Sequence, residues 1–253
     1  MSKVLILGSD GMLGSALRRA LPKATALTRK DFDLATPVWN DRKFQDIVAD
    51  HEYVVNAAGL INRRMDDLTA LWAVNAVFPQ ALSALCASSG SQMIHISTDC
   101  VFDGKSGLHT ENDAPNATDP YGLSKALGEN AAAMMVLRTS IIGPEDKSFY
   151  SLLCWVLAQE EPITGYDDHL WNGVTTVELA RVIKTITENK KYKTGIHNVH
   201  GEDISKADLI AMILNLFGKD TPLIRGKGPY PSDKRLRSVH GGFDIAPLRA
   251  QIE

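Results

Sequence analysis

Short apolar runs alternate with helical patterns through the first half of the chain, and this alternation restricts the possible fold more than any other feature. The predicted strands are residues 3–7, 25–28, 53–56, 92–97 and 135–138, and the predicted helices are residues 12–21, 43–50, 68–87 with a kink at Pro79, and one that begins at Pro120. Strands separated by helices favour a parallel sheet that is covered on both faces. We therefore expect a doubly wound α/β fold, which binds ligands beyond the carboxyl ends of its strands.

A glycine turn directly follows the first predicted strand, with Gly8, Gly11 and Gly14 spaced by three residues. In a dinucleotide-binding turn the first glycine permits the tight turn, the second lets a pyrophosphate approach the backbone, and the third allows close packing of helix on strand. The phosphates then meet a helix N-terminus, which favours anions. A plain strand–turn–helix with incidental glycines is the alternative, and the position directly after an apolar strand favours the nucleotide.

The residues after the second predicted strand indicate which cofactor binds. A free ribose 2′-hydroxyl usually meets an acidic residue about 20 residues after the turn, but Thr28 and Arg29 stand there. A hydroxyl and a guanidinium suit a 2′-phosphate, so NADPH is favoured. Asp31 and Asp33 lie close by and keep NADH open as the alternative, and Arg29 could also be a solvated surface charge. Asp33 and Leu34 could flank the adenine.

Tyr121 and Lys125 are one turn apart in a helix that is expected to begin with Asp119 as its N-cap and Pro120 as its first residue. A nearby ammonium group favours the phenolate, so Lys125 is expected to lower the pKa of Tyr121 and prepare it to pass a proton to a carbonyl. Thr98 follows a predicted strand and would hydrogen-bond to the same carbonyl oxygen. The pattern predicts proton transfer beside hydride transfer.

The same spacing recurs at Tyr230 and Lys234. There Pro231 biases Tyr230 away from helical geometry, and nothing places the pair near a strand end. We therefore assign the chemistry to Tyr121. Without the glycine turn and the preceding strand end, Tyr121 and Lys125 would also be better interpreted as a surface tyrosine beside a solvated lysine.

Other side chains have a structural and a functional interpretation. His95 alternates with apolar residues on a predicted strand and is interpreted as a core histidine. Trp171 is either part of the core or a platform on which a base or sugar stacks. The basic clusters at residues 63–64 and 234–237 are either solvated faces or contacts for a diphosphate.

The composition argues against several classes of protein. The net charge of −3 disfavours a nucleic-acid partner. The three cysteines are scattered and form no metal-binding cluster with histidine, which fits a reduced, cytoplasmic setting. The first apolar run is too short for a signal peptide, and no run approaches the ~20 apolar residues of a membrane span. We expect no metal site and no membrane partner.

Motifs in a fixed order make the chain resemble the extended short-chain dehydrogenase/reductases, and within them the dTDP-4-dehydrorhamnose reductase group of sugar-nucleotide reductases. The matching stretches are Gly8-x-x-Gly11-x-x-Gly14, Asn56-Ala57-Ala58-Gly59, Asn75, Ser97-Thr98-Asp99-Cys100 through Gly104, Tyr121-Gly-x-Ser-Lys125 through Glu129, and Leu137-Arg138-Thr139-Ser140. Their shared order and spacing are far more specific than any one of them.

The resemblance implies that Thr98, Tyr121 and Lys125 are the catalytic residues. It implies NADPH as cofactor, held by Gly8, Gly11, Met12, Leu13, Gly14, Thr28, Arg29, Asp33, Leu34, Ala57, Ala58, Gly59, Asn75 and Lys125. It implies a nucleoside-diphosphate 4-keto-6-deoxy sugar as substrate, for the synthesis of surface polysaccharide precursors, with contacts from Asp99, Cys100, Trp171 and Arg235. A homodimer packed through the long helix is expected by analogy with this fold.

Under this interpretation residues 1–140 form an NADP-binding Rossmann domain. Residues 141–253 form mainly a smaller substrate-binding lobe, and a segment of about 173–200 returns to the Rossmann domain. Cys100 stands where the group usually has a tyrosine, and residues 171–175 and 230–231 also depart from its pattern. These differences fall near the expected sugar pocket, so they leave the sugar and the nucleotide base open.

Two alternatives use the same fold. An NAD-retaining epimerase or dehydratase would recycle its hydride, and Arg29 argues against it. A non-catalytic NADP-binding regulatory subunit, similar to that of methionine adenosyltransferase, would need no catalytic residues. The presence of Thr98, Tyr121 and Lys125 argues against that class.

Overall fold

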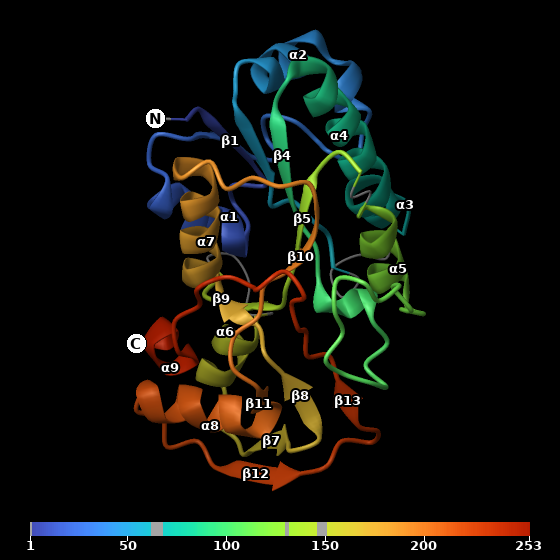
Figure 1. Ribbon diagram of the computed structural model, residues 1–253. Helices are drawn as coiled ribbons and strands as arrows, with labels where there is room; N and C mark the ends of the chain where they lie inside the picture. The colour runs from blue at the N-terminus through green and yellow to red at the C-terminus, as the bar shows by residue number, and fades with distance from the viewer. Residues whose placement is uncertain (1, 62–67, 130–131, 146–150) are drawn as a thin grey trace.

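The protein is described by a computed structural model that covers residues 2–61, 68–129, 132–145 and 151–253 (Figure 1). Within these residues a parallel sheet has the strand order β10-β5-β4-β3-β1-β2. Its strands are β1 (Val4–Leu7), β2 (Thr25–Leu27), β3 (Tyr53–Asn56), β4 (Gln92–Ile96), β5 (Met135–Arg138) and β10 (Gly195–Asn198). The order reverses between β1 and β3, which is where such a sheet opens a ligand crevice. The predicted doubly wound, Rossmann-type fold is confirmed.

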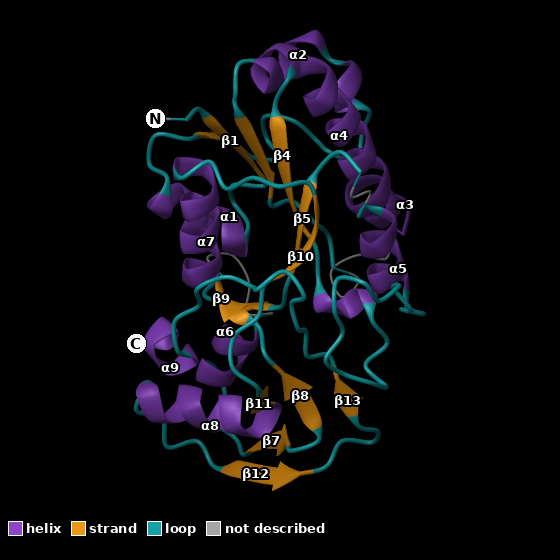
Figure 2. Cartoon of the chain, viewed as in Figure 1, coloured by secondary structure: helices purple, strands orange, loops and turns teal. Residues whose placement is uncertain are grey.

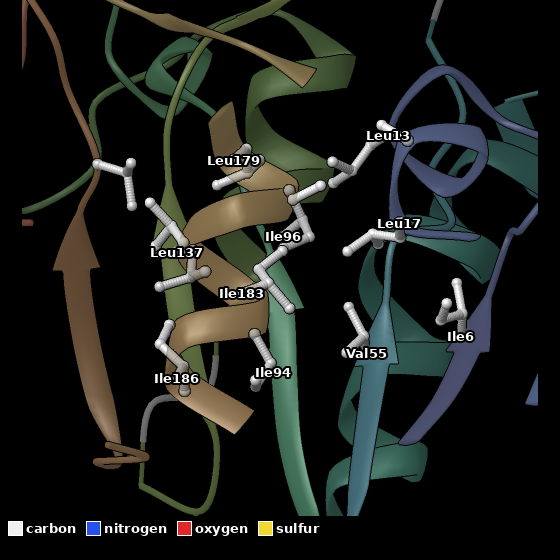
Figure 3. Close-up of a cluster of buried hydrophobic side chains, with 14 of the residues drawn as sticks. Ile6, Leu13, Leu17, Val55, Ile94, Ile96, Leu137, Leu179, Ile183 and Ile186 are labelled. Carbon is white, nitrogen blue, oxygen red and sulfur yellow. The ribbon is translucent and has the colours of Figure 1, made fainter. Parts of the chain in front are cut away.

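Helices cover both faces of the sheet (Figure 2). On one face lie α1 (Met12–Ala20) and α7 (Thr176–Glu188), and on the other lie α2 (Arg42–Ala49), α3 (Leu68–Trp72), α4 (Phe78–Ser89) and α5 (Pro120–Leu127). Because strand side chains alternate between faces, Ile6 enters the cluster beneath α1 and α7, whereas Leu5 and Leu7 enter the cluster beneath α2 and α4. Figure 3 shows the first cluster, in which Leu17 and Ile183 meet strand residues such as Ile94.

The long predicted helix is interrupted at the expected place. The π-helical segment η3 (Ala73–Val77) separates α3 from α4, and Pro79 stands in the first turn of α4. Proline has no amide hydrogen for the carbonyl four residues earlier, which belongs to Asn75, and the backbone widens there. The whole stretch Leu68–Ser89 is long and apolar enough to cross a membrane by length and composition alone, which the sequence analysis did not expect. Half of its most apolar window is buried inside the protein, as in a core helix.

The second half of the chain forms a lobe at the carboxyl end of the sheet (Figure 1). Its strands are β6 (Ile141–Ile142), β7 (Ile163–Tyr166), β8 (His169–Trp171), β9 (Val174–Thr175), β11 (Ile204–Ser205), β12 (Leu223–Gly226) and β13 (Ser232–Asp233), and its helices are α6 (Leu152–Leu157), α8 (Lys206–Leu216) and α9 (Leu248–Ile252). They pair as β11-β8-β13, β12-β7 and β6-β9 among the described residues. Two short 3-10 helices, Val38–Asn40 before α2 and Asp99–Val101 after β4, lie in connections of the large sheet.

The segment that contains α7 and β10 lies between elements of the lobe in sequence but joins the large sheet in space, where β10 pairs with β5. The lobe also returns to the loop after β4: Asp233 N donates to Gly104 O at 2.7 Å, and His109 N donates to Arg235 O at 3.1 Å. The boundary at residue 140 stays a prediction, because the two halves exchange segments.

Candidate active site

The glycine turn has the geometry that a pyrophosphate requires. Gly8 has a φ of +75°, and a Cβ there would lie 2.7 Å from the Cα of Ala58 on the neighbouring strand end. A Cβ on Gly14 would lie 2.2 Å from the carbonyl oxygen of Gly8. Helix α1 begins after Gly11, which provides no side-chain cap, so its first amide groups face the turn. The turn therefore needs its glycines and offers backbone donors to an anion.

A cavity of about 490 Å³ opens beside this turn, a size typical of small-molecule sites. Of the predicted cofactor residues, its walls contain Gly8, Gly11, Thr28, Arg29, Asp33, Leu34, Ala57, Ala58 and Gly59. Met12, Leu13 and Gly14 lie in α1 outside these walls, and Leu13 packs into the apolar core. The structure thus brings together segments from the ends of β1, β2 and β3.

The rim of this cavity carries charges of both signs. The Arg29 guanidinium is exposed and lies 3.2 Å from the Asp33 carboxylate. Thr28 donates its amide and its hydroxyl to Asp31, at 2.8 and 2.9 Å. These hydrogen bonds from Thr28, the backbone one first, lower the pKa of Asp31. The side chains that were expected to meet the ribose are therefore in place, and each has an acidic neighbour.

Asn75 makes hydrogen bonds to two other segments of the protein. Its Oδ1 accepts from Leu60 N at 2.9 Å, and its Nδ2 donates to Leu60 O at 2.8 Å and to Ser124 Oγ at 3.1 Å. Three of the four hydrogen bonds that this amide can make are therefore to the protein, and they use both of its donors. Asn75 ties the segment after β3 to helix α5, and its contact with the cofactor stays a prediction.

His95 is fully buried on β4, as the core interpretation predicted. Its Nδ1 lies 3.2 Å from Asn56 Nδ2, and its Nε2 has no hydrogen-bond partner among the described residues. Burial, with the nearby Lys125 charge, places the pKa of His95 well below its usual value, so the ring is neutral. The Asn56 Oδ1 in turn accepts from Ala58 N and shapes the cavity wall.

Thr98, Tyr121 and Lys125 lie together, as predicted. Asp119 caps α5 by accepting from Gly122 N at 3.0 Å, which sets Tyr121 in the first turn. The Thr98 hydroxyl lies close enough to the Tyr121 phenol to lower its pKa, and it donates to Asp99 Oδ1 at 3.1 Å. The Lys125 ammonium donates to Ile96 O at 2.6 Å, and a Cβ on Gly59 would lie 3.8 Å from its Nζ. Lys125 therefore lies beside Gly59, a residue of the cavity wall.

The expected direction of the tyrosine pKa is wrong in this structure. Burial, followed by the Cys100 thiol, raises the pKa of Tyr121, while the Thr98 hydrogen bond lowers it. Burial lowers the pKa of Lys125 to about 8, and the Glu129 carboxylate opposes that shift. Lys125 directs its charge to a backbone carbonyl, so desolvation outweighs the effect of the ammonium on the phenol.

A buried ion pair lies next to the elements that carry Thr98, Tyr121 and Lys125. Arg138, at the end of β5, is 1% exposed and lies 2.7 Å from the Glu129 carboxylate. The same carboxylate accepts from Ser97 Oγ at 2.5 Å, one residue before Thr98. Glu129 therefore connects the end of β4, the end of β5 and the helix that carries Lys125.

The predicted substrate residues have different surroundings. Asp99 and Cys100 follow Thr98 directly, and burial raises the pKa of the Asp99 carboxyl and that of the Cys100 thiol, the latter to about 12. Trp171 is 2% exposed in the core of the lobe, which favours its core interpretation. Arg235 is bound by Asp233 and Asp203.

Lys206 was not singled out in the sequence, whereas Lys234 belongs to the basic cluster 234–237. Tyr230 is 71% exposed, so the second tyrosine–lysine pair does not form a site, but Asp99 and the Cys100 thiol raise the pKa of Lys234. Lys206, at the start of α8, also acts electrostatically on Cys100. No local pattern marks Lys206, because its position depends on how the lobe folds back. The other basic cluster, residues 63–64, lies outside the described residues.

Comparison with known proteins agrees with this geometry. A family model described as the RmlD substrate binding domain matches residues 2–238. A protein of Mycobacterium tuberculosis (strain CDC 1551 / Oshkosh) named dTDP-4-dehydrorhamnose reductase is 26% identical over 243 residues, which cover 88% of this chain and 78% of that protein. The spore coat polysaccharide biosynthesis protein SpsK of Bacillus subtilis is 28% identical over 241 residues, which cover 88% and 82%.

A solved structure shares the fold. The dTDP-4-dehydrorhamnose reductase of Bacillus anthracis, solved in complex with NADP, superposes with a TM-score of 0.83 over 99% of this chain and 97% of that one, at 17% sequence identity. At this identity the likeness shows the fold alone.

Proposed function

The chain belongs to the RmlD substrate binding domain family, and from this premise we propose that it is an NADPH-dependent reductase of a nucleoside-diphosphate 4-keto-6-deoxy sugar. One observation carries the proposal: Thr98 and Tyr121 lie close together, and Lys125, one helix turn after Tyr121, lies beside Gly59 in the wall of the cavity at the glycine turn. A proton donor and a carbonyl anchor therefore stand next to a nucleotide site. That is the arrangement that carbonyl reduction needs.

The residues present fit a dinucleotide. A Cβ at Gly8 or Gly14 would clash with backbone atoms of Ala58 or of the turn itself, so the turn keeps this shape only with glycine there, and the N-terminus of α1 faces the turn. Arg29 at the rim suits the 2′-phosphate of NADPH, and NADH stays an alternative because Asp33 neutralises part of that charge. When bound, NADPH supplies the hydride that reduces the keto carbon.

Residues of the chain then bind the keto oxygen of the substrate and donate the proton. The hydroxyls of Thr98 and Tyr121 hold the keto oxygen, and the phenol gives its proton to that oxygen as the alcohol forms. The raised pKa of Tyr121 keeps the phenol protonated until this step. The ammonium of Lys125, buried at the end of β4, stabilises the phenolate that remains.

The substrate class comes from the relatives. One is named a dTDP-4-dehydrorhamnose reductase and another a spore coat polysaccharide biosynthesis protein. We propose the same class of keto-sugar nucleotide for this chain and a place in making surface polysaccharide precursors. A cytoplasmic location follows from such substrates and also stays a proposal.

The experiment that tests this function is Tyr121→Phe. NADPH consumption with dTDP-4-dehydrorhamnose is expected to fall at least 1,000-fold, because the proton donor is lost, while NADPH affinity stays within about twofold. Tyr230→Phe is the matched control, since that tyrosine has the same spacing to a lysine but is 71% exposed. Undiminished turnover in Tyr121→Phe would refute the assignment.

The same assay separates the alternatives. A reductase consumes one NADPH for each product molecule. Product without NADPH consumption would favour the NAD-retaining epimerase or dehydratase, and NADPH binding without turnover on any keto-sugar nucleotide would favour the regulatory subunit.

A homodimer stays a prediction. Large apolar side chains are exposed on the face formed by α3 to α5: Leu68, Val77, Leu123 and Leu127. A dimer packed through this face would cover them. Sedimentation of the wild type and of Leu127→Glu tests it, because a charge in the interface should shift the protein to monomer.

A further inference from the structure

A cavity of about 380 Å³ lies at the β10 edge of the large sheet. Its walls come mainly from α7, the loop between α7 and β10, β10 itself and the segment 238–244 that follows β13. No described residue lines both this cavity and the one at the glycine turn, and β10 and β2 are opposite edges of the sheet. The volume lies within the range of small-molecule sites. A ligand here would therefore be separate from the cofactor.

The walls of this cavity carry more positive than negative charge. Arg181 lies 2.8 Å from the Glu178 carboxylate and also donates to the backbone carbonyl of Asp244. Lys191 and Lys193, exposed in the loop before β10, take part in no ion pair with the residues that the structure describes. Asp244 is the one acidic residue among the described wall residues. Two ammonium charges are therefore left for an anion.

His197 adds a buried imidazole to the same wall. It is 8% exposed on β10 and pairs in register with Leu137, which belongs to the cluster beneath α1 and α7. Its Nε2 lies 3.0 Å from Lys193 O and carries a proton there, because a carbonyl oxygen only accepts. Burial lowers the pKa of His197, so the neutral ring has Nδ1 as an acceptor, and no described residue bonds to that atom. The ring centre of His240 lies 5.4 Å away and adds a second imidazole.

The segment 238–244 closes one side of the cavity and is held near both of its ends. Val239 N donates to Glu111 Oε2 at 2.8 Å, and Ala246 N donates to Glu178 Oε1 at 2.8 Å, so both carboxylates already have donors. Figure 1 shows this segment in red, between β10 and α9. The apolar part of the wall consists of Met135, Val182, Ile186 and Phe243. The cavity therefore combines cationic side chains with an apolar surface.

We propose that this cavity is a phosphate site, in which Lys191, Lys193 and His197 surround a phosphate group, free or esterified. The site goes beyond the proposed reduction, because it lies at the edge of the sheet opposite the cofactor cavity. Two ammonium groups suit the charge of about −1.5 to −2 that a phosphate ester carries at neutral pH. A protonated phosphate oxygen can also donate to the free Nδ1, whereas an ionised carboxylate only accepts. Phosphate is therefore favoured over a carboxylate, and Phe243 would contact the organic part of an ester.

The test is titration calorimetry with inorganic phosphate, phenyl phosphate and benzoate, on protein whose cofactor cavity is saturated with NADP⁺. The variant combines Lys191→Met with Lys193→Met, which removes both charges and keeps most of the side-chain volume. Lys190→Met is the matched control, because Lys190 is exposed in the same loop but outside the cavity wall. The double variant is expected to bind both phosphates about tenfold more weakly than the control, because charge-assisted contacts are lost.

The outcomes also identify the source of the phosphate. Tighter binding of phenyl phosphate than of inorganic phosphate, with the difference lost in Phe243→Ala, assigns the site to an organic phosphate. Equal affinity for both phosphates assigns it to inorganic phosphate. The proposal is overturned if the wild type binds neither phosphate, if benzoate binds as tightly as phenyl phosphate, or if the double variant and Lys190→Met have the same affinities.

The titration requires neither a keto sugar nor turnover. A phosphate that binds only on the substrate side of Thr98 and Tyr121 would be unaffected by the double variant, so that result counts against the proposal. The outcome is therefore independent of whether Tyr121→Phe abolishes reduction.

Discussion

The charge of Lys125 is expected to make the stability of the protein depend on pH, and Lys125→Met should reveal it. Lys125 is 4% exposed, and burial lowers its pKa from 10.5 to about 8. The folded protein therefore releases this proton at about pH 8, whereas the unfolded chain keeps it to about 10.5. At ~1.4 kcal/mol for each pH unit, holding the ammonium in the fold costs about 3 kcal/mol below pH 8.

The sign follows from this proton difference. The cost is fully present below pH 8 and disappears as the pH rises toward 10.5. Across that interval the wild type should therefore gain about 3 kcal/mol of unfolding free energy relative to Lys125→Met. At pH 7 the variant escapes the cost but loses the hydrogen bond to Ile96 O, worth about 1.5–3 kcal/mol for a charged donor, so the two proteins should be nearly equal there.

Urea unfolding of both proteins at several pH values between 7 and 10.5 measures this difference. The comparison cancels other titrations, such as those of Cys86 and Cys100, which are present in both proteins. Two unfolding curves that keep a constant separation, within about 0.5 kcal/mol across this range, would refute the reasoning. That result would mean that Lys125 stays charged in the folded protein and that its environment is more polar than the geometry indicates.

Three other substitutions test separate parts of the structure. Gly14→Ala places a Cβ 2.2 Å from a backbone oxygen of the same turn, so NADPH affinity measured by fluorescence should fall more than tenfold, while Gly226→Ala, with open space around it, should not change it. Arg29→Ala should raise the KM for NADPH about tenfold and leave that for NADH unchanged, and equal changes in both would count against a 2′-phosphate contact. Arg138→Met leaves the Glu129 carboxylate buried without its partner and should lower the unfolding free energy by about 3–5 kcal/mol, measured by urea denaturation.

The large sheet could be predicted because its inner strands β1, β3, β4 and β5 are almost entirely buried. Residues such as Val4–Leu7 and Met135–Arg138 are buried along their whole length, so they read as continuous apolar runs between helical patterns. The lobe strands could not be predicted in the same way. Strands β11 and β13 have two residues each and are only partly buried, and their partner β8 lies far away in sequence. Their pairing comes from tertiary contacts and leaves no periodic signal.

Part of the candidate site could likewise be predicted from the sequence, and part could not. Thr98, Tyr121 and Lys125 lie on adjacent elements of the predicted sheet, so strand ends and one helix turn were enough to bring them together. The direction of the Tyr121 pKa was missed because it depends on burial, which spacing does not report. The hydrogen bonds of Asn75 could not be predicted because its partners Leu60 and Ser124 are distant in sequence.

Lys234 belongs to a tyrosine–lysine pair that does not form a site, because Tyr230 is exposed. The backbone of the same strand is nevertheless bonded to the loop that follows Thr98, since Asp233 N donates to Gly104 O. Thr98, Tyr121 and Lys125 follow a strand of the large sheet or lie on a helix that covers it, whereas residues 171–175 and 230–231, which depart from the pattern of the resembled group, lie in the lobe. Under the proposed function, substitutions in the lobe would therefore alter the choice of substrate and leave the carbonyl chemistry unchanged.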